Sequence, residues 1–242
     1  MTGSGAVVVG GGSGIGAAVA RRQRDAGIRV LTWDLGGTGD IECDITEPEQ
    51  VAAATVATQA EIGVPGLVTI TVGIGHSGLL SEVTPTEWDR VMAVNAKGVW
   101  LTMRALAAPM RDAGGGSIVA TSSVSSRLVD RSMGLYCASK AALDMVVKVA
   151  AAEWAPSLRV NAVAPGVTDT PMLGRAPRTG EWLSGVVERT LLGRLGTPDD
   201  VAEAILAVHA MGWVTGQVLD VDGGLSLQSP IDSFRHAPTR PG

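Results

Sequence analysis

The sequence predicts an α/β fold: a single domain built on a doubly wound parallel sheet with helices on both faces. Short apolar runs rich in β-branched residues alternate along the chain with alanine-rich stretches at the helical period. The runs are apolar throughout, so each strand is expected to be buried on both faces, as in parallel sheets. The 242 residues suffice for a large core, and no linker or internal repeat divides them.

Strands and helices are predicted in strict alternation. The strand segments are 6–9, 28–33, 66–72, 117–122, 158–164 and 217–221, with a further short strand before Asp44. The helices are expected near 14–26, 48–62, 86–111, 135–154 and 198–210. Thr46, Thr84 and Thr197 each precede a proline and an acid, and are predicted to cap the helices that follow.

Composition argues against several function classes. The net charge of −5 offers no basic surface for nucleic acid, and the arginines at 21, 22 and 24 are expected on a solvated helix face. Cys43 and Cys137 form no CxxC pair and are expected to be buried thiols in a reducing compartment. No stretch approaches the roughly 18 apolar residues of a membrane span. A cytoplasmic protein without membrane contact is therefore predicted, and no metal site is expected.

The first strand runs directly into a glycine-rich turn and a helix. The segment is "GGGSGIG", residues 10–16. Glycines at 10, 14 and 16 let the backbone turn tightly and approach a pyrophosphate, whose charge then meets free N–H groups at the helix N-terminus. This pattern indicates a dinucleotide site of the Rossmann type, with a purely structural turn as the alternative.

Two acids follow the next strands. Asp34 lies eighteen residues beyond Gly16, where a carboxylate can accept hydrogen bonds from the adenosine ribose and repel a 2′-phosphate. That position favours NAD over NADP, unless Asp34 is an ordinary loop aspartate. Asp44 follows the short third strand and is expected either to reach the adenine edge or to be a turn residue.

The only tyrosine of the chain, Tyr136, is followed four residues later by Lys140, one of three lysines. On a helix these two side chains lie on one face. A free phenol titrates near pH 10, and an ammonium about 5 Å away is worth roughly 3 kcal/mol, or about two pKa units toward phenolate. We therefore predict that Lys140 lowers the pKa of Tyr136 into the range of a proton donor and acceptor. A surface tyrosine beside a solvated lysine is the alternative.

With these residues in hand, the chain resembles the short-chain dehydrogenases/reductases from about residue 5 to 225. The order and spacing of the motifs carry the resemblance: "GGGSGIG" (10–16), Asp34, "CDIT" (43–46), Asn95 in "VMAVNAKG", "SIVATSS" (117–123), "YCASK" (136–140), "VNAVAPGVTDTPM" (160–172), "GRLGTPDDVA" (193–202) and "VTGQVLDVDGG" (214–224).

The resemblance implies roles for particular residues. Tyr136 would be the general acid/base and Lys140 its partner, while Ser123, thirteen residues before the tyrosine, would bind the substrate oxygen. Asn95 would hold a water that links Lys140 to solvent; otherwise it is a helix-interior amide bonded to backbone. The cofactor would be NAD, and its implied contacts, beyond Tyr136 and Lys140, are Gly10, Ser13, Gly14, Ile15, Gly16, Asp34, Asp44, Ile45, Thr71, Val167 and Thr168.

Two departures from the family pattern occur together. Val9 stands where threonine is usual, and residues 70–73 read ITVG where Asn-Asn-Ala-Gly is usual. Losing only one side of the tie between these segments would strand a buried polar group at about 1–3 kcal/mol. We therefore expect Val9 to pack against residues 70–72 as an apolar replacement. The contact of Thr71 with cofactor is correspondingly less secure.

The long segment 167–196 resembles the substrate lid of the family, and loops of this length are often functional. Its apolar side chains are expected to line a pocket for a largely apolar alcohol or ketone, or else to pack the lid's own short helix: Met172, Leu173, Trp182, Leu183, Val186 and Val187. Arg175 and Arg178 are expected either to meet an anionic substrate or to be solvated. His76 and Arg127 are placed near the pocket without a role.

The predicted activity is hydride transfer between NAD(H) and a secondary alcohol or ketone. A 3-oxoacyl thioester reductase using NADPH is the second reading, against which Asp34 argues. A cofactor-binding regulator would lack one of the serine, tyrosine and lysine, and all three are present. The resemblance also implies a homotetramer built on the helices near 86–111 and 135–154, and residues 225–242 are expected to form an arm that contacts a neighbouring subunit.

Overall fold

A computed structural model describes residues 5–173 and 179–227 of the chain. Within these ranges seven strands form one parallel sheet in the order β3-β2-β1-β4-β5-β6-β7. The strands are β1 (Ala6–Val9), β2 (Val30–Asp34), β3 (Ile41–Glu42), β4 (Leu67–Ile70), β5 (Gly116–Thr121), β6 (Leu158–Pro165) and β7 (Val218–Val221). The predicted α/β class and strand positions are confirmed. Arg175, Arg178 and most of the expected C-terminal arm lie outside the described residues.

The helices fall where the helical period placed them. They are α1 (Gly14–Asp25), α2 (Pro48–Ile62), α3 (Pro85–Met92), α4 (Val99–Asp112), α5 (Gly134–Trp154), α6 (Gly180–Arg189) and α7 (Pro198–Ala210). A π-helical turn, η1 (Ala93–Gly98), joins α3 to α4. The segment predicted as one helix over 86–111 is thus interrupted by the turn that contains Asn95. Such turns often occur at functional sites.

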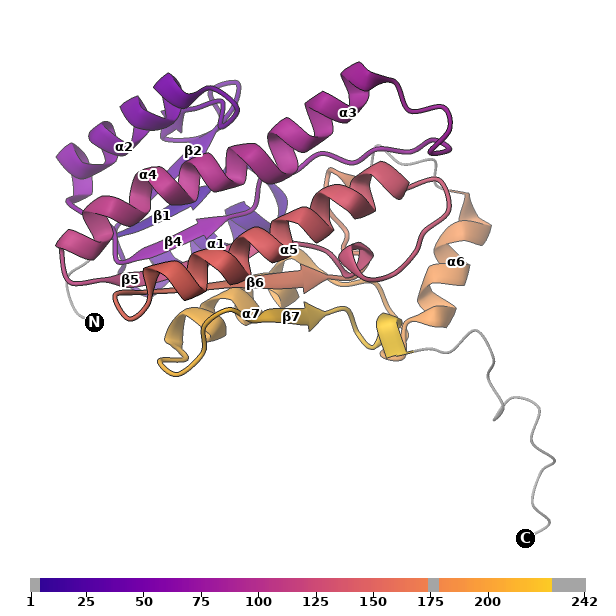
Figure 1. Ribbon diagram of the computed structural model, residues 1–242. Coiled ribbons are helices and arrows are strands. Elements are labelled where there is room, and N and C mark those ends of the chain that lie inside the picture. Colours follow the sequence, from indigo (N-terminus) through magenta and orange to yellow (C-terminus); the bar gives the residue numbers. More distant parts are fainter. Residues whose placement is uncertain (1–4, 174–178, 228–242) are drawn as a thin grey trace, which may run out of the picture.

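Alternate residues of each strand face opposite helical layers. Val7 and Val9 pack in the apolar cluster covered by α2, α4 and α5, whereas Ala6 and Val8 belong to the cluster covered by α1 and α7. Figure 1 shows α2, α4 and α5 in front of the sheet and α1 and α7 behind it. The strands are buried on both faces because both layers are present.

Two of the three predicted threonine caps are confirmed. Thr84 and Thr197 accept hydrogen bonds from the backbone N–H groups of Glu87 and Asp200, whose carboxylates return the bond. The cap predicted at Thr46 is wrong. Helix α2 begins one residue later, after Glu47, without a side-chain cap, because the hydroxyl of Thr46 donates to Asp44 instead.

The sheet changes direction of winding beside β1, which pairs with β2 on one side and β4 on the other. Ligands of such sheets bind at the carboxyl ends of the strands next to this point. The strand arrows in Figure 1 run toward the end of the molecule where α6 stands. The fold therefore brings the turns after β1, β4, β5 and β6 to one edge.

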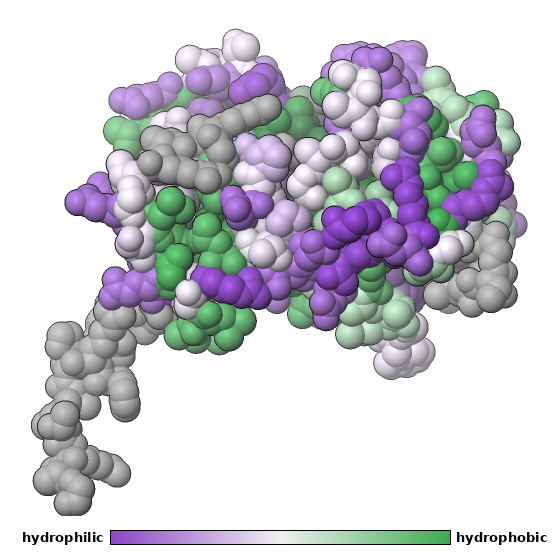
Figure 2. Space-filling model, turned by 180° about the vertical axis from the view of Figure 1, so that it is seen from behind, coloured by the Kyte–Doolittle hydropathy of each residue, from purple (hydrophilic) through white to green (hydrophobic). Residues whose placement is uncertain are grey.

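The rear face of the molecule carries both hydrophilic and hydrophobic side chains. Figure 2 shows a band of hydrophilic residues across it with hydrophobic patches beside it. The arginines expected on a solvated face contribute ion pairs there: Arg21 and Arg22 contact Asp199 on α7, and Arg24 contacts Asp40. These pairs are exposed, so each adds little to stability.

Two predicted absences can be compared with the described residues. No helix in ranges 5–173 and 179–227 is long and apolar enough to cross a membrane, and no cluster of three or more metal-binding side chains occurs among them. Both cysteines are free thiols, with Cys43 buried and Cys137 partly exposed. Burial raises the pKa of Cys43 to about 11.

Candidate active site

The glycine turn forms an open cradle at the start of α1. Gly10 and Gly14 have positive φ, and a Cβ on Gly16 would lie 2.0 Å from the carbonyl oxygen of Gly10. Ser13 begins the helix without a side-chain cap, and no acid occurs in the first turn. The N–H groups of this helix start are thus left to an external anion, which fits the pyrophosphate of a dinucleotide.

Asp34 closes one side of this cradle. Its Oδ2 accepts a hydrogen bond of 2.7 Å from Gly12 N, and its Oδ1 accepts one of 2.8 Å from Leu35 N. The carboxylate is therefore fixed at the end of β2, against the glycine turn. Its position fits the ribose contact that the spacing predicts.

Asp44 and Ile45 are committed to local structure. Asp44 Oδ1 accepts hydrogen bonds from both the backbone N–H and the hydroxyl of Thr46. Asp44 therefore acts as a turn residue, the second of the two alternatives predicted for it. The side chain of Ile45 is buried and lies against Gly98, where an added Cβ would meet Ile45 Cγ1 at 2.8 Å. The side chain packs in the core between α2 and η1, and the contact of Ile45 with a cofactor stays a prediction.

The segments around Val9 and Thr71 are joined by both apolar and polar contacts. Val9 is buried in one apolar cluster with Ile70 and Val72, as predicted. The tie is not wholly apolar, however, because Thr71 Oγ1 donates at 3.1 Å to the carbonyl oxygens of Val9 and Gly10. Thr71 thus replaces the missing polar partner and fixes the turn from beneath.

Tyr136 and Ser123 meet at the carboxyl edge of the sheet. Tyr136 lies in the first turn of α5, and Ser123 follows the end of β5 as the cap of the short helix η2 (Val124–Ser126). The Ser123 side chain lies close enough to the phenol to lower the pKa of Tyr136, and its Oγ accepts a hydrogen bond of 3.2 Å from Ser125 N. Ser122 instead donates to Asp144 at 2.5 Å. The structure therefore separates the two adjacent serines, and Ser123 is the one beside the tyrosine.

Lys140 is buried beneath the tyrosine. Its Nζ donates at 2.9 Å to the carbonyl oxygen of Thr121 and lies 5.8 Å from the centroid of the Tyr136 ring. The two side chains thus share one face of α5, as the spacing predicts. Burial lowers the pKa of Lys140 to about 8, and the neighbouring Asp144 carboxylate opposes that shift.

The predicted direction of the tyrosine shift is wrong for the protein alone. Burial raises the pKa of Tyr136, and the neighbouring Ser123 side chain offsets this only in part. The spacing of Tyr136 and Lys140 predicts a cation beside the phenol, but it does not account for burial of the phenol. Burial removes water from the phenolate and so disfavours the charged form. A phenol in this site keeps its proton at neutral pH.

Asn95 bonds to backbone, as the alternative for this residue predicts, and its part in a water link to Lys140 stays a prediction. Its Nδ2 donates to Ile74 O at 2.9 Å and to Ser139 Oγ at 3.0 Å, and its Oδ1 accepts from Ile74 N at 2.8 Å. The amide therefore holds the segment after β4. A Cβ built on Gly73 would lie 3.2 Å from Lys140 Nζ and 3.5 Å from Asn95 Oδ1, so these two atoms face the same small space.

The segment after β6 covers the glycine turn. Gly196 N donates to Val167 O at 3.0 Å, and the buried Thr168 donates to Gly166 O at 3.1 Å. A Cβ on Gly14 would lie 3.5 Å from Thr170. Val167 and Thr168 thus lie in the segment just after β6, where Thr168 forms an isolated bridge with Gly196.

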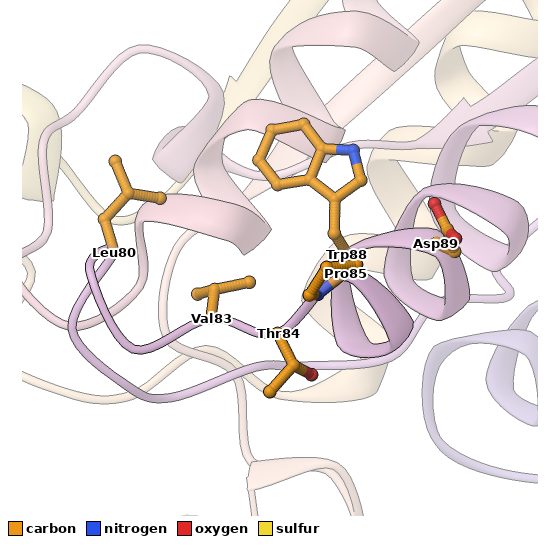
Figure 3. A pocket seen from close by; sticks show the side chains of 6 residues that line it. All are labelled: Leu80, Val83, Thr84, Pro85, Trp88 and Asp89. Atoms are coloured by element: carbon orange, nitrogen blue, oxygen red, sulfur yellow. The ribbon is translucent and has the colours of Figure 1, made fainter.

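The apolar side chains of the lid are accessible in its described part. None of the α6 residues is buried, and Met172 and Trp182 are 42% and 39% exposed, so their role as a pocket wall stays a prediction. An apolar pocket of about 480 Å³ lies elsewhere, between the loop after β4 and the start of α3 (Figure 3). It is lined by Leu80, Val83, Thr84, Pro85, Trp88 and Asp89.

This pocket borders the start of α5. A Cβ on Gly134 would lie 3.4 Å from Leu80 Cδ1, and Gly78 N donates to Ser132 O at 2.8 Å. The loop after β4 is therefore held against the segment that precedes Tyr136. The lining residues were not predicted. Apolar residues in an otherwise polar loop could have indicated a pocket there.

His76 and Arg127 have partners that the sequence did not reveal. His76 Nε2 lies 3.7 Å from Glu87 Oε1, and its Nδ1 is buried without a hydrogen-bond partner in the described part of the chain. Arg127 pairs with Asp144 and Asp220. Asp144 was also missed; its spacing of four residues from Lys140 was the available signal.

Comparison with known proteins was made for the whole chain. The family described as Enoyl-(Acyl carrier protein) reductase matches residues 9–226. The chain is 34% identical to the cis-4-hydroxycyclohexanecarboxylate dehydrogenase of Sinomonas cyclohexanicum over 90% of this chain and 95% of that protein. It is also 34% identical to the galactitol 2-dehydrogenase (L-tagatose-forming) of Cereibacter sphaeroides, over 94% and 96%. A short-chain type dehydrogenase/reductase from Mycobacterium marinum superposes with a TM-score of 0.87 at 29% identity, covering 93% of this chain and 96% of that one.

Proposed function

The chain belongs to the short-chain dehydrogenase/reductase family of oxidoreductases, and from this premise we propose that it interconverts a secondary alcohol and a ketone with NAD(H). The observation that carries the proposal is the convergence of Ser123, Tyr136 and Lys140 at the carboxyl edge of the sheet, with Ser123 near enough to act on the pKa of the phenol and Lys140 Nζ 5.8 Å from the centroid of its ring. Relatives named for dehydrogenation of a hydroxycyclohexane acid and of galactitol support the reaction class.

A bound nicotinamide would supply the chemistry of hydride transfer to or from the carbinol carbon. In the direction of reduction, Tyr136 donates its proton to the oxygen that gains charge, and Ser123 donates a hydrogen bond to the same oxygen. The raised pKa of Tyr136 suits a donor, because the phenol holds its proton at neutral pH. In oxidation Tyr136 must first lose its proton, so that the phenolate oxygen can receive the proton of the alcohol. The positive charge of Lys140 and that of an oxidised nicotinamide would favour this phenolate.

Proton exchange with solvent would follow the buried polar atoms below the tyrosine. Lys140 Nζ and Asn95 Oδ1 face one small space beside Gly73, and Asn95 Nδ2 continues to the carbonyl of Ile74. We assign Asn95 to this relay through Oδ1, since both protons of its Nδ2 are already given to Ile74 and Ser139.

The cofactor contacts proposed here follow the geometry of the cradle. The N–H groups of Ser13, Gly14, Ile15 and Gly16 would meet the pyrophosphate. Asp34 would accept from the ribose hydroxyls and disfavour a 2′-phosphate, which supports NAD over NADP. Val167 and Thr168 would contact the carboxamide of the nicotinamide.

A largely apolar substrate is proposed for this site. The pocket between Leu80, Val83 and Trp88 presents mostly apolar side chains, and the loop that carries Leu80 rests against α5 just before Tyr136. We propose that the apolar part of the substrate extends from the reacting carbon toward this pocket.

Replacement of Tyr136 tests the function directly. We expect Tyr136→Phe to lower kcat by about 100- to 10,000-fold, because the variant has no proton to exchange. The affinity for NADH, measured by the quenching of tryptophan fluorescence, should stay close to that of the wild type. Cys137→Ser, a change at the adjacent residue, serves as control. Near-normal turnover by Tyr136→Phe would refute the proposal.

A second candidate is a reductase of 3-oxoacyl thioesters. The description of the matching family names a reductase of enoyl thioesters, which shares the acyl-carrier-protein group with this candidate but reduces a C=C bond. A panel of secondary alcohols, ketones and one 3-oxoacyl thioester, assayed with NAD(H) and NADP(H), separates the candidates. Preference for the thioester with NADPH would replace our first proposal.

A further inference from the structure

Helix α5 is attached to the end of β5 by two side chains one helical turn apart. Lys140 Nζ donates to Thr121 O at 2.9 Å. Asp144 Oδ1 accepts from the hydroxyl of the next residue, Ser122, at 2.5 Å. Thr121 is the last residue of β5 and Ser122 follows it, while Lys140 and Asp144 lie four residues apart on α5. The two contacts therefore prevent α5 from sliding along its axis relative to the end of β5. Ser123, the next residue along, is thereby held opposite Tyr136.

Asp144 is buried and fully engaged. Only 7% of its surface is exposed. Its second oxygen, Oδ2, lies 3.3 Å from Arg127 Nη1, and the guanidinium of Arg127 reaches onward to Asp220 on β7. A buried carboxylate is unfavourable unless it is paired and hydrogen-bonded. This one has both, a hydroxyl donor in Ser122 and a cation in Arg127.

The carboxylate also acts on the lysine. Burial lowers the pKa of Lys140 to about 8, and Asp144 is the group that opposes this shift. The other titratable groups nearby are Tyr136 on the same helix, Arg127 after β5 and Asp220 on β7. The contact from η1 is the neutral amide of Asn95. Asp144 is thus the anion one turn from the ammonium.

We propose that Asp144 is a positioning residue of this active site, which holds the Ser122–Ser123 segment in register with Tyr136 and keeps the Lys140 ammonium charged through its own carboxylate. Arg127 completes the arrangement by pairing with Asp144 on the side of β7. This inference rests on the proposed function for its effect on turnover, but its electrostatic part concerns the protein alone.

The electrostatic part can be measured without substrate. The chain has three lysines, Lys97, Lys140 and Lys148, so NMR of protein labelled with ¹³C-lysine gives three titrating signals, and a Lys140→Arg variant identifies one of them. In Asp144→Asn we expect the Lys140 midpoint to fall by about one pH unit, because its anionic neighbour is gone. Glu153→Gln, an exposed acid on the same helix, should leave it unchanged. An unshifted midpoint in Asp144→Asn would overturn this part.

Turnover tests the other part. Asp144→Asn should lower kcat and move its alkaline limb to lower pH by the same amount as the NMR midpoint, and Asp144→Glu should restore both in part. Ser122→Ala should lower kcat about tenfold without moving the Lys140 midpoint, since it removes a hydrogen bond and not a charge. Wild-type kcat in Ser122→Ala would overturn the positioning role.

Two further outcomes are distinguishable. If the wild-type protein oxidises no alcohol in the panel, the proposed function fails, and the NMR midpoint still decides the electrostatic inference. If Asp144→Asn does not fold, Asp144→Ser makes the same change of charge with a hydroxyl that can still bond Ser122, and the same midpoint is measured.

Discussion

Asp34 is the single residue on which cofactor choice depends. Its carboxylate is held by the backbone N–H groups of Gly12 and Leu35, so it cannot swing away from an approaching phosphate. Arg24, a basic group at the end of α1, is paired with Asp40. In this environment a 2′-phosphate would meet a fixed negative charge.

We therefore expect Asp34→Asn to narrow the preference for NAD. The ratio of kcat/KM for NAD to that for NADP should fall about tenfold or more, because the repulsion is lost while the size of the side chain is kept. Steady-state assays with both cofactors measure it. Glu49→Gln, at an exposed acid on α2, is the control and should keep the wild-type ratio. An unchanged ratio in Asp34→Asn would exclude a role for this carboxylate in discrimination.

Among the structural elements, α7 is attached to the sheet by a buried histidine. His209 Nε2 and Nδ1 lie 2.9 Å from the hydroxyls of Thr69 on β4 and Ser117 on β5. Burial, with a smaller contribution from Arg159, lowers the pKa of His209 to about 3. The folded protein thus keeps this ring neutral at a pH where the unfolded chain protonates it.

The sign of the pH effect follows from this shift. Between about pH 6.5 and pH 3 the unfolded state binds a proton that the folded state does not, so stability falls as the pH falls. Between pH 7 and pH 5 we expect His209 to account for roughly 2 kcal/mol of lost unfolding free energy. Denaturant titrations of wild type and His209→Gln at both pH values measure it. Equal losses in the two proteins would contradict the assignment.

At the scale of the whole molecule, apolar side chains stand exposed on the layer formed by α3, α4 and α5. They are Trp88, Trp100, Met145 and Val149. Met145 and Val149 lie one turn apart on α5, on the side away from the sheet. This face supports the homotetramer that the family resemblance implies, in which a second copy would cover it.

We propose that this layer is the subunit interface, and Val149→Glu tests it. A charge there should convert the tetramer to smaller species, because burying an unpaired carboxylate is unfavourable. Sedimentation velocity measures the assembly state. Val56→Glu, at an exposed valine on α2, is the matched control and should leave the assembly unchanged. A Val149→Glu protein that sediments as the wild type does would place the interface elsewhere.

The layered α/β architecture and the pairing of Tyr136 with Lys140 could be predicted from the amino-acid sequence alone. Periodicity determined the strands and helices because apolar spacing is a local property of the chain. Two threonine caps followed from spacing, and Tyr136 and Lys140 had to be neighbours because four residues make about one helical turn. Local rules failed at Thr46, since the competing acceptor Asp44 lies two residues before it.

Properties that depend on burial or on contacts between distant segments became known only from the three-dimensional structure. The raised pKa of Tyr136 could not be read from spacing, because desolvation depends on everything packed around the phenol. The same holds for the contact of Ser122 with Asp144 and for the commitment of Ile45 to the core. The pocket beside Leu80 likewise requires the loop after β4 to meet the start of α5, segments about fifty residues apart. The local sequence does not predict such contacts, because they depend on how the whole chain packs.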